Sequence, residues 1–218
     1  MKPIRIALTK GRLEKDTVAL LESLGYDCSQ LHNKGRKLIL SVPDAGLEIV
    51  LAKAADVITY VEHGVCDMGV VGKDTIMEYG GSFFETTDLG FGRCKFAVAG
   101  KKGQKENLYT GYQVKTIATK YPNITRHFFA GKDMDVRIVK IEGSVELAPL
   151  LGLADAIVDI VETGATLREN GLEVYEDVAQ ISARLIVNTV SMKLYRQRIE
   201  EIISRMEAAI AEKEAMNS

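Results

Sequence analysis

An acidic strand end followed by a Thr-Gly-x-Thr turn carries the clearest chemistry in this 218-residue chain. An apolar run holds Asp155 and Asp159 and leads directly into the turn. Carboxylates at a strand end can accept hydrogen bonds from ribose hydroxyls, and the turn offers backbone N–H groups and hydroxyls to a phosphate at a helix start. The segment therefore predicts a sugar-phosphate site formed by Asp155, Asp159, Glu162, Thr163, Gly164, Ala165 and Thr166.

The same turn has an ordinary structural interpretation. Thr163 or Thr166 would then simply cap a helix that follows a strand. The two aspartates at a spacing of four residues before the turn favour the binding site over this alternative.

Strand-like and helix-like runs alternate along the chain and must position this segment. Apolar runs predict strands at residues 4–8, 38–42, 47–52, 68–71, 96–99, 115–118, 136–141 and 156–161. Helical spacing predicts helices at 13–24, 54–63, 73–79, 121–130 and 144–151, with a polar loop at 99–111. A long terminal helix carries an apolar stripe, which favours packing on the chain's own first half, with a partner-binding helix as the alternative. This alternation is typical of an α/β fold with largely parallel strands.

Two small α/β lobes account for the length of the chain. We expect the first lobe to comprise residues 1–92 plus 178–218, and the second lobe to comprise residues 93–177 with the phosphate-binding turn. Two such lobes usually enclose a cleft in which ligands bind.

Charge and hydropathy exclude several classes of protein. Lys plus Arg number 28 and Asp plus Glu number 30, a net charge of −2 that argues against a nucleic-acid clamp. The sequence contains no run of the roughly 18–20 apolar residues that a membrane span needs. The cysteines and histidines are too widely spaced for a metal site, and no secretory signal is evident, so we expect a cytoplasmic protein.

The turn and its surroundings resemble the signature of the ATP phosphoribosyltransferase family. Other segments extend the similarity over nearly the whole chain, including 7–13, 36–38, 56–64, 67–74, 93–96, 117–122 and 143–149. The signature positions are occupied here by Glu146, Gly152, Ala154, Ile157, Asp159, Ile160, Thr163, Gly164, Thr166 and Leu167.

The resemblance implies a fold and a reaction. The fold would be like the type II periplasmic-binding proteins, with two α/β lobes and a central cleft. The reaction would join N1 of ATP to C1 of 5-phosphoribosyl 1-diphosphate, the phosphoribosyl donor, and release pyrophosphate in the first step of histidine biosynthesis. Mg²⁺ would be the cofactor, carried by the diphosphate rather than by protein ligands.

Roles for individual residues follow from the resemblance. Arg12 and Arg36 would be catalytic, because fixed guanidinium groups stabilise the charge that grows on leaving diphosphate. The alternative for each is a solvated surface charge. Further nucleotide or diphosphate contacts would come from Lys10, Gly11, Lys73, Glu142 and Glu146.

Since 218 residues leave no room for the regulatory domain of the long family members, we expect this chain to be a short form. A short form implies a separate regulatory subunit that resembles histidyl-tRNA synthetase, around a homodimeric core within a hetero-oligomer. Neither a nucleic acid nor a membrane is expected as a partner. Two other functions remain open at this point: a non-catalytic two-lobed binding module, and a phosphoribosyltransferase for another base.

Overall fold

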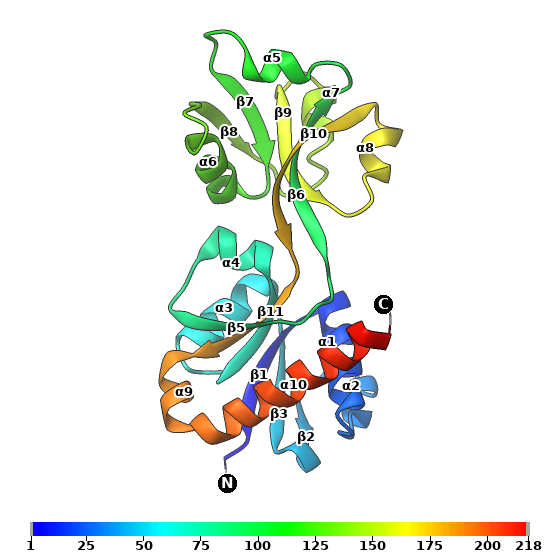
Figure 1. Ribbon diagram of the computed structural model, residues 1–218, viewed down its shortest axis with the longest axis vertical. Helices are drawn as coiled ribbons and strands as arrows, with labels where there is room; N and C mark the ends of the chain where they lie inside the picture. The colour runs from blue at the N-terminus through cyan, green and yellow to red at the C-terminus, as the bar shows by residue number, and fades with distance from the viewer. Residues whose placement is uncertain (1, 217–218) are drawn as a thin grey trace. The chain divides into compact units, whose positions relative to one another are not determined.

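The computed structural model describes residues 2–216, which form two α/β units (Figure 1). One unit combines Met1–Gly92 with Ser182–Ser218, and the other is Arg93–Ile181. The return to the first unit therefore comes later than the predicted boundary at residue 178. Strand pairing explains the difference, because β10 (Leu172–Ile181) stays hydrogen-bonded to β6 (Cys94–Lys101) as far as its last residue.

The first unit is built on a six-stranded sheet with the order β2-β3-β1-β4-β11-β5. Its strands are β1 (Ile4–Thr9), β2 (Ile39–Val42), β3 (Leu47–Ala52), β4 (Met68–Gly72), β5 (Phe83–Asp88) and β11 (Ala183–Asn188). Its helices are α1 (Arg12–Ser23), α2 (Ser29–His32), the 3-10 turn η1 (Pro43–Ala45), α3 (Ala54–Glu62), α4 (Lys73–Tyr79), α9 (Thr189–Leu194) and α10 (Arg196–Met216).

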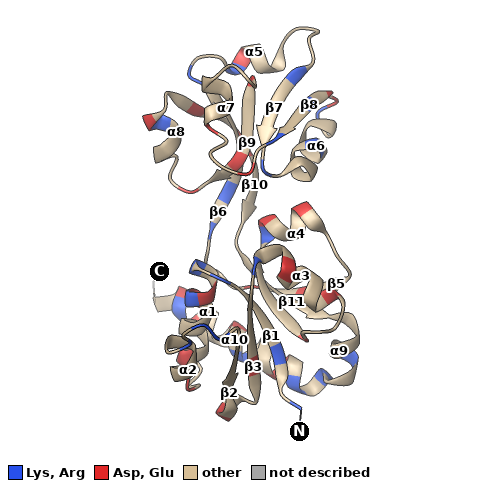
Figure 2. Ribbon diagram, turned by 180° about the vertical axis from the view of Figure 1, so that it is seen from behind, with Lys and Arg blue, Asp and Glu red and all other residues tan. Residues whose placement is uncertain are grey.

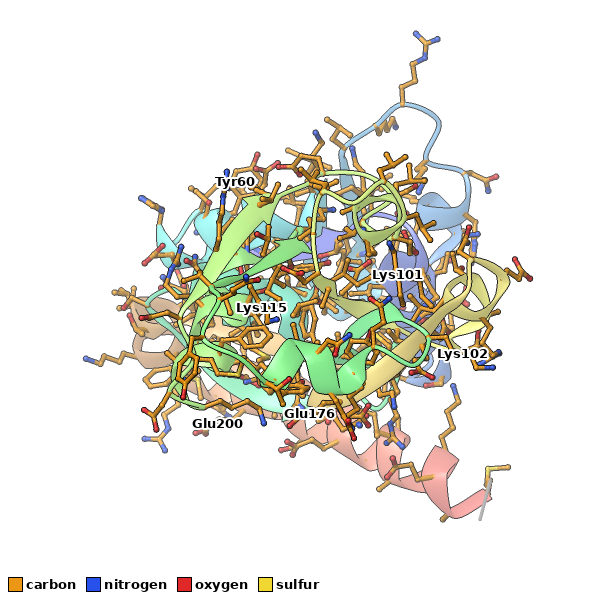
Figure 3. The ribbon with its side chains drawn as sticks, turned by 90° about the horizontal axis from the view of Figure 1, so that it is seen from above. Tyr60, Lys101, Lys102, Lys115, Glu176 and Glu200 are labelled. Carbon is orange, nitrogen blue, oxygen red and sulfur yellow. The ribbon has the colours of Figure 1, made fainter. Side chains whose placement is uncertain are left out.

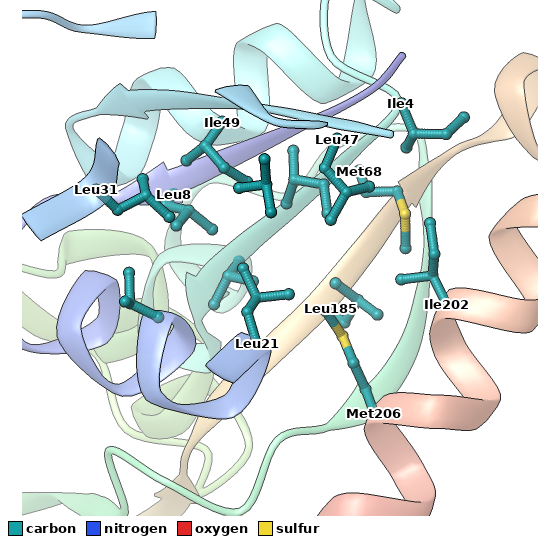
Figure 4. Packing of buried hydrophobic residues seen from close by; sticks show 14 of the residues in the cluster. Ile4, Leu8, Leu21, Leu31, Leu47, Ile49, Met68, Leu185, Ile202 and Met206 are labelled. Atoms are coloured by element: carbon teal, nitrogen blue, oxygen red, sulfur yellow. The ribbon is translucent and has the colours of Figure 1, made fainter. Parts of the chain in front are cut away.

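Both faces of this sheet are covered. On one face, α1 and α10 pack over an apolar core that includes Leu21, Leu185 and Met206 (Figure 4). On the other face, α3 buries Val57 and Val61 against the sheet. The apolar stripe of α10 is buried in its own unit, with Ile199 and Met206 fully inaccessible, which confirms the packing predicted for the terminal helix.

The second unit has a five-stranded sheet with the order β10-β6-β9-β7-β8. One face carries an apolar cluster with Phe96, Ile124 and Phe129, and the other a cluster with Ala148, Ile157 and Leu167. Its remaining elements are α5 (Lys105–Tyr109), β7 (Lys115–Thr119), α6 (Pro122–Ala130), β8 (Val136–Lys140), α7 (Leu147–Leu150), β9 (Ala156–Val161) and α8 (Ala165–Glu169).

The prediction of largely parallel strands is wrong, because both sheets are mixed. Helical crossovers produce parallel pairs, as in β1–β3, β1–β4, β7–β8 and β7–β9. In contrast, β10 passes into β11 through Ser182 without a helix, and both of these strands pair antiparallel with their neighbours. The predicted loop at 99–111 is also wrong in part, since β6 extends to Lys101 and α5 follows it.

Among residues 2–216, none of the helices combines the length and the apolar character that crossing a membrane requires.

Candidate functional site

A polar pocket of about 250 Å³ lies in the second unit, at the C-terminal end of β9. It gathers most of the sugar-phosphate residues predicted from the sequence, together with Glu146. Its lining consists of Glu146, Asp159, Ile160, Val161, Glu162, Thr163, Gly164, Ala165, Thr166 and Leu167.

The turn of this pocket depends on a glycine in a left-handed conformation. Gly164 has a φ of 69° and is the N-cap of α8, so neither Thr163 nor Thr166 is the cap that the alternative interpretation requires. A Cβ at Gly164 would approach Nη1 of Arg168 to 3.2 Å in a backbone conformation that L residues rarely adopt. The Thr163 hydroxyl accepts a hydrogen bond from the Ala165 N–H at 3.3 Å and keeps its own proton for donation.

Asp159 is a titratable group of the pocket whose pKa is clearly shifted by its surroundings. The pKa of its carboxyl is raised to about 6, mainly by burial and in smaller part by the charge of Glu146. Two contacts oppose this shift, the Ile160 N–H that donates to Oδ1 at 2.8 Å and the charge of Lys120. Above pH 6 the carboxylate is therefore ionised and able to accept hydrogen bonds from ribose hydroxyls.

Asp155 does not lie in this pocket. It precedes β9, whose six residues span about 20 Å between Asp155 and the turn. Its Oδ2 accepts a hydrogen bond from the Thr116 N–H at 2.7 Å, and it lines a separate cavity of about 260 Å³ that also includes Lys101. Figure 3 looks onto this opposite end of the second unit's sheet, where Lys101 and Lys115 are labelled.

The raised pKa of Asp159 predicts a measurable effect of Asp159→Asn on stability. The carboxyl has its ordinary pKa of 3.8 in the unfolded chain and a pKa of about 6 in the folded one, so the folded state retains a proton between these values. The free energy of unfolding of the natural chain therefore falls as the pH rises through this window. Since asparagine does not ionise, the variant is expected to melt at a higher temperature than the natural chain at pH 7.5.

Thermal unfolding from pH 4 to pH 7.5 measures this effect. The difference in melting temperature should be greatest above pH 6 and should shrink toward pH 4. A difference that is constant over this range would contradict the assignment of the effect to the Asp159 charge.

A basic edge lies on the first unit, at the C-terminal ends of β1 and β3, where ligands of α/β proteins commonly bind. Lys10 and Gly11 form the loop after β1, Arg12 is the first residue of α1, and the Lys10 N–H donates to the Ala52 carbonyl at 3.0 Å. Arg36 precedes β2, which runs antiparallel to β3 and so begins at the same edge. The structure thus brings together the loops of Lys10, Gly11, Arg12 and Arg36, and Lys and Arg can be followed in blue in Figure 2.

Two further lysines lie near the proposed sites but were not singled out as site residues from the sequence. Lys53 follows β3 directly and joins the basic edge, and Lys120 follows β7 and acts electrostatically on Asp159. Each is a lysine immediately after a buried strand, which is the signal that could have found them.

Two other predicted contacts are engaged elsewhere in the structure. Nζ of Lys73 lies 2.6 Å from Oε2 of Glu85. Glu142 pairs with Lys140 at 2.8 Å, a contact that lowers the pKa of Glu142, and it is not part of the pocket lining. In the part of the chain that the structure describes, no group of three His, Cys, Asp or Glu side chains could hold a metal ion.

Comparison with protein families links this arrangement to a known enzyme. The family model "HisG: ATP phosphoribosyltransferase" matches residues 53–208. An ATP phosphoribosyltransferase of Clostridium kluyveri is 57% identical over 211 residues, covering 97% of this chain and 95% of that protein. An ATP phosphoribosyltransferase of Bacillus cereus is 55% identical over 210 residues, covering 96% and 98%.

Solved structures agree with this result. The ATP phosphoribosyl transferase (HisG:HisZ) complex from Thermotoga maritima matches with a TM-score of 0.80 and 32% identity, over 96% of this chain and 99% of that chain. The periplasmic aliphatic sulphonate binding protein SsuA from Escherichia coli matches with a TM-score of 0.61 and 13% identity, over 100% of this chain and 75% of that chain. The second likeness concerns the fold alone, and it confirms the predicted type II periplasmic-binding-protein-like, two-lobed class.

Proposed function

This chain belongs to the ATP phosphoribosyltransferase family, and on that premise we propose how its residues divide the work of the reaction. The enzyme joins N1 of ATP to C1 of 5-phosphoribosyl 1-diphosphate and releases pyrophosphate, which is the first step of histidine biosynthesis. ATP and the phosphoribosyl donor are its two substrates.

The pocket of the second unit is proposed to bind the phosphoribosyl donor. The observation that carries this assignment is the meeting of Asp159 and Glu146 with the Thr163–Gly164 turn around one polar cavity. Backbone N–H groups and the hydroxyls of Thr163 and Thr166 would bind the 5′-phosphate, since they can donate several hydrogen bonds to one anion. The Asp159 carboxylate would accept hydrogen bonds from the ribose hydroxyls, and Glu162 would border the same site.

The basic edge of the first unit is proposed to stabilise the leaving diphosphate. As the bond between C1 and the diphosphate oxygen stretches, negative charge grows on the leaving group and the ribose becomes oxocarbenium-like. Guanidinium groups held in place before the reaction lower this barrier, because they need no reorganisation as the charge develops. Arg12 and Arg36 would supply them, with Lys10 and Gly11 as further contacts from the same edge.

Members of this family need a divalent metal ion, which we propose to be Mg²⁺. Mg²⁺ usually keeps several water ligands and binds through substrate phosphates, so we expect the diphosphate to carry it. Bound to the diphosphate, the ion would neutralise part of the leaving-group charge. The residues of this chain would then orient the donor and stabilise the remaining negative charge of the leaving group.

A regulatory subunit is proposed as the partner of this chain. The similarity to the solved HisG:HisZ complex, which covers 99% of that chain, supports a hetero-oligomeric assembly. We expect a subunit that resembles histidyl-tRNA synthetase, around a homodimeric core of this chain. The expected cytoplasmic location also stays a prediction.

Chromatography of reaction mixtures tests this function. The purified chain, ATP, the donor and Mg²⁺ should yield pyrophosphate and the ATP adduct together, with the regulatory subunit added if the chain alone is slow. Removal of Mg²⁺ with a chelator should abolish both products, and renewed Mg²⁺ should restore them. Full turnover in chelator would contradict the metal assignment, and silence under all conditions would contradict the function.

A further inference from the structure

Glu14 is a buried carboxylate in the first turn of α1. Its exposed fraction is 6%, and a charged group is rarely so buried without partners. One carboxylate oxygen, Oε2, accepts a hydrogen bond from the Gly11 backbone N–H at 3.3 Å, and the other, Oε1, forms an ion pair with Nζ of Lys34. Glu14 thus connects two segments that lie 20 residues or more apart from each other along the chain.

Each partner of Glu14 belongs to a loop that carries a basic residue of the proposed site. Gly11 lies between Lys10 and Arg12 in the loop after β1. Lys34 lies two residues before Arg36, in a turn that the hydrogen bond from the Lys37 N–H to the Lys34 carbonyl closes at 3.0 Å. One carboxylate of α1 therefore contacts both the loop that leads into Arg12 and the loop that carries Arg36.

We propose that Glu14 is a positioning residue for the transferase reaction, one that fixes the loops of Arg12 and Arg36 relative to each other. The inference rests on the proposed leaving-group role of these arginines. Its physical basis is preorganisation, because a cation stabilises developing charge best when its position is set before the reaction. Arg36 itself is exposed, so its placement depends on how firmly its loop is held.

The backbone conformation of Gly11, in the loop after β1, shows why the hydrogen bond to Glu14 matters. Gly11 has a φ of 105° and a ψ of −130°, and as the N-cap it has no side chain to bind the helix start. The Glu14 side chain reaches back and accepts a hydrogen bond from the Gly11 N–H, the half of a capping box that needs no N-cap side chain, and so orders the residue that links Lys10 to Arg12. The ion pair with Lys34 extends the same order to the second loop.

Two variants remove the ion pair between Glu14 and Lys34 from opposite sides. Glu14→Gln keeps an oxygen that can accept from the Gly11 N–H but loses the charge that holds Lys34. Lys34→Gln removes the same ion pair from its more exposed end, where the side chain is 37% accessible, and so tests the inference if Glu14→Gln folds poorly. Glu22→Gln is the matched control, since Glu22 lies on the same helix and its exposed side chain pairs with that of His32, a contact of 2.6 Å that involves none of residues 10–12 and 34–37.

The expected result is a loss of turnover without a loss of donor binding. Misplacement of a catalytic group by about 1 Å can lower rates about 100-fold, so Glu14→Gln and Lys34→Gln should lower kcat about 10- to 100-fold. The dissociation constant of the donor should stay within about twofold of that of the natural chain, because the proposed donor site lies in the other unit. Glu22→Gln should leave kcat unchanged.

A double-mutant cycle separates positioning from a merely structural role. If Glu14 acts through Arg36, then Glu14→Gln should have much less effect on kcat when Arg36 is already alanine. The inference would be overturned if Glu14→Gln lowered kcat by the same factor in the natural chain and in Arg36→Ala. It would also be overturned if neither Glu14→Gln nor Lys34→Gln changed kcat. Full activity of Arg36→Ala alone would instead refute the proposed role of Arg36, so the two failures are distinguishable.

Discussion

Arg36→Ala is expected to lower kcat about 100- to 1,000-fold while weakening donor binding far less. Arg36 lies at the basic edge of the first unit, and the charge it is proposed to meet grows as pyrophosphate leaves. An interaction made mainly in the transition state affects kcat more than ground-state binding. Steady-state kinetics together with calorimetric titration of the donor measure the two effects separately.

Two variants serve as controls for this prediction. Arg36→Lys keeps the charge but not the guanidinium fork, so it should recover only part of the lost rate. Lys15→Ala removes an exposed cation of α1 from outside the loop and should leave kcat unchanged. Unchanged turnover in Arg36→Ala combined with weakened donor binding would contradict the leaving-group role.

Asp159→Asn is expected to weaken donor binding about 10- to 100-fold at pH 7.5. With a pKa of about 6, the carboxylate is ionised at this pH and accepts strong hydrogen bonds. A hydrogen bond to a charged group contributes about 1.5–3 kcal/mol, which corresponds to the expected loss of affinity. Titration calorimetry measures the dissociation constants directly.

Asp155→Asn is the matched control for this experiment. It makes the same chemical change on the same chain segment, but at the opposite end of β9. Its amide oxygen can still accept from the Thr116 N–H, so the fold should survive. Donor affinity should be unchanged in Asp155→Asn, and equal losses in the two variants would remove Asp159 from the ribose site.

The sequence could predict the turn at 162–166 because its chemistry is local. The strand, the left-handed glycine and the following helix are specified by adjacent residues, so their geometry follows from short-range rules. The same reasoning could not separate Asp155 from Asp159. Their spacing of four suggested a common site, whereas four residues of extended strand separate their Cα atoms by about 13 Å and leave Asp155 at the other end of β9.

Long-range contacts explain the other omissions. The Glu14–Lys34 ion pair joins residues whose proximity depends on how the loops fold onto the sheet edge, and no local pattern encodes it. The segment of β10 carries three acidic residues among its ten, which hides the usual strand alternation. Its pairing with β6, with two irregularities in register, stabilises it as a strand in spite of that pattern.

Amide chemical shifts of the ¹⁵N-labelled chain during titration with the phosphoribosyl donor and Mg²⁺ test the central claim most directly, because they report where the donor binds. We predict the largest shift changes at the backbone amides of residues 162–166, with the amides of residues 152–155 at the other end of β9 little changed. Changes concentrated at 152–155, with residues 162–166 unaffected at saturating donor, would contradict the proposed donor site.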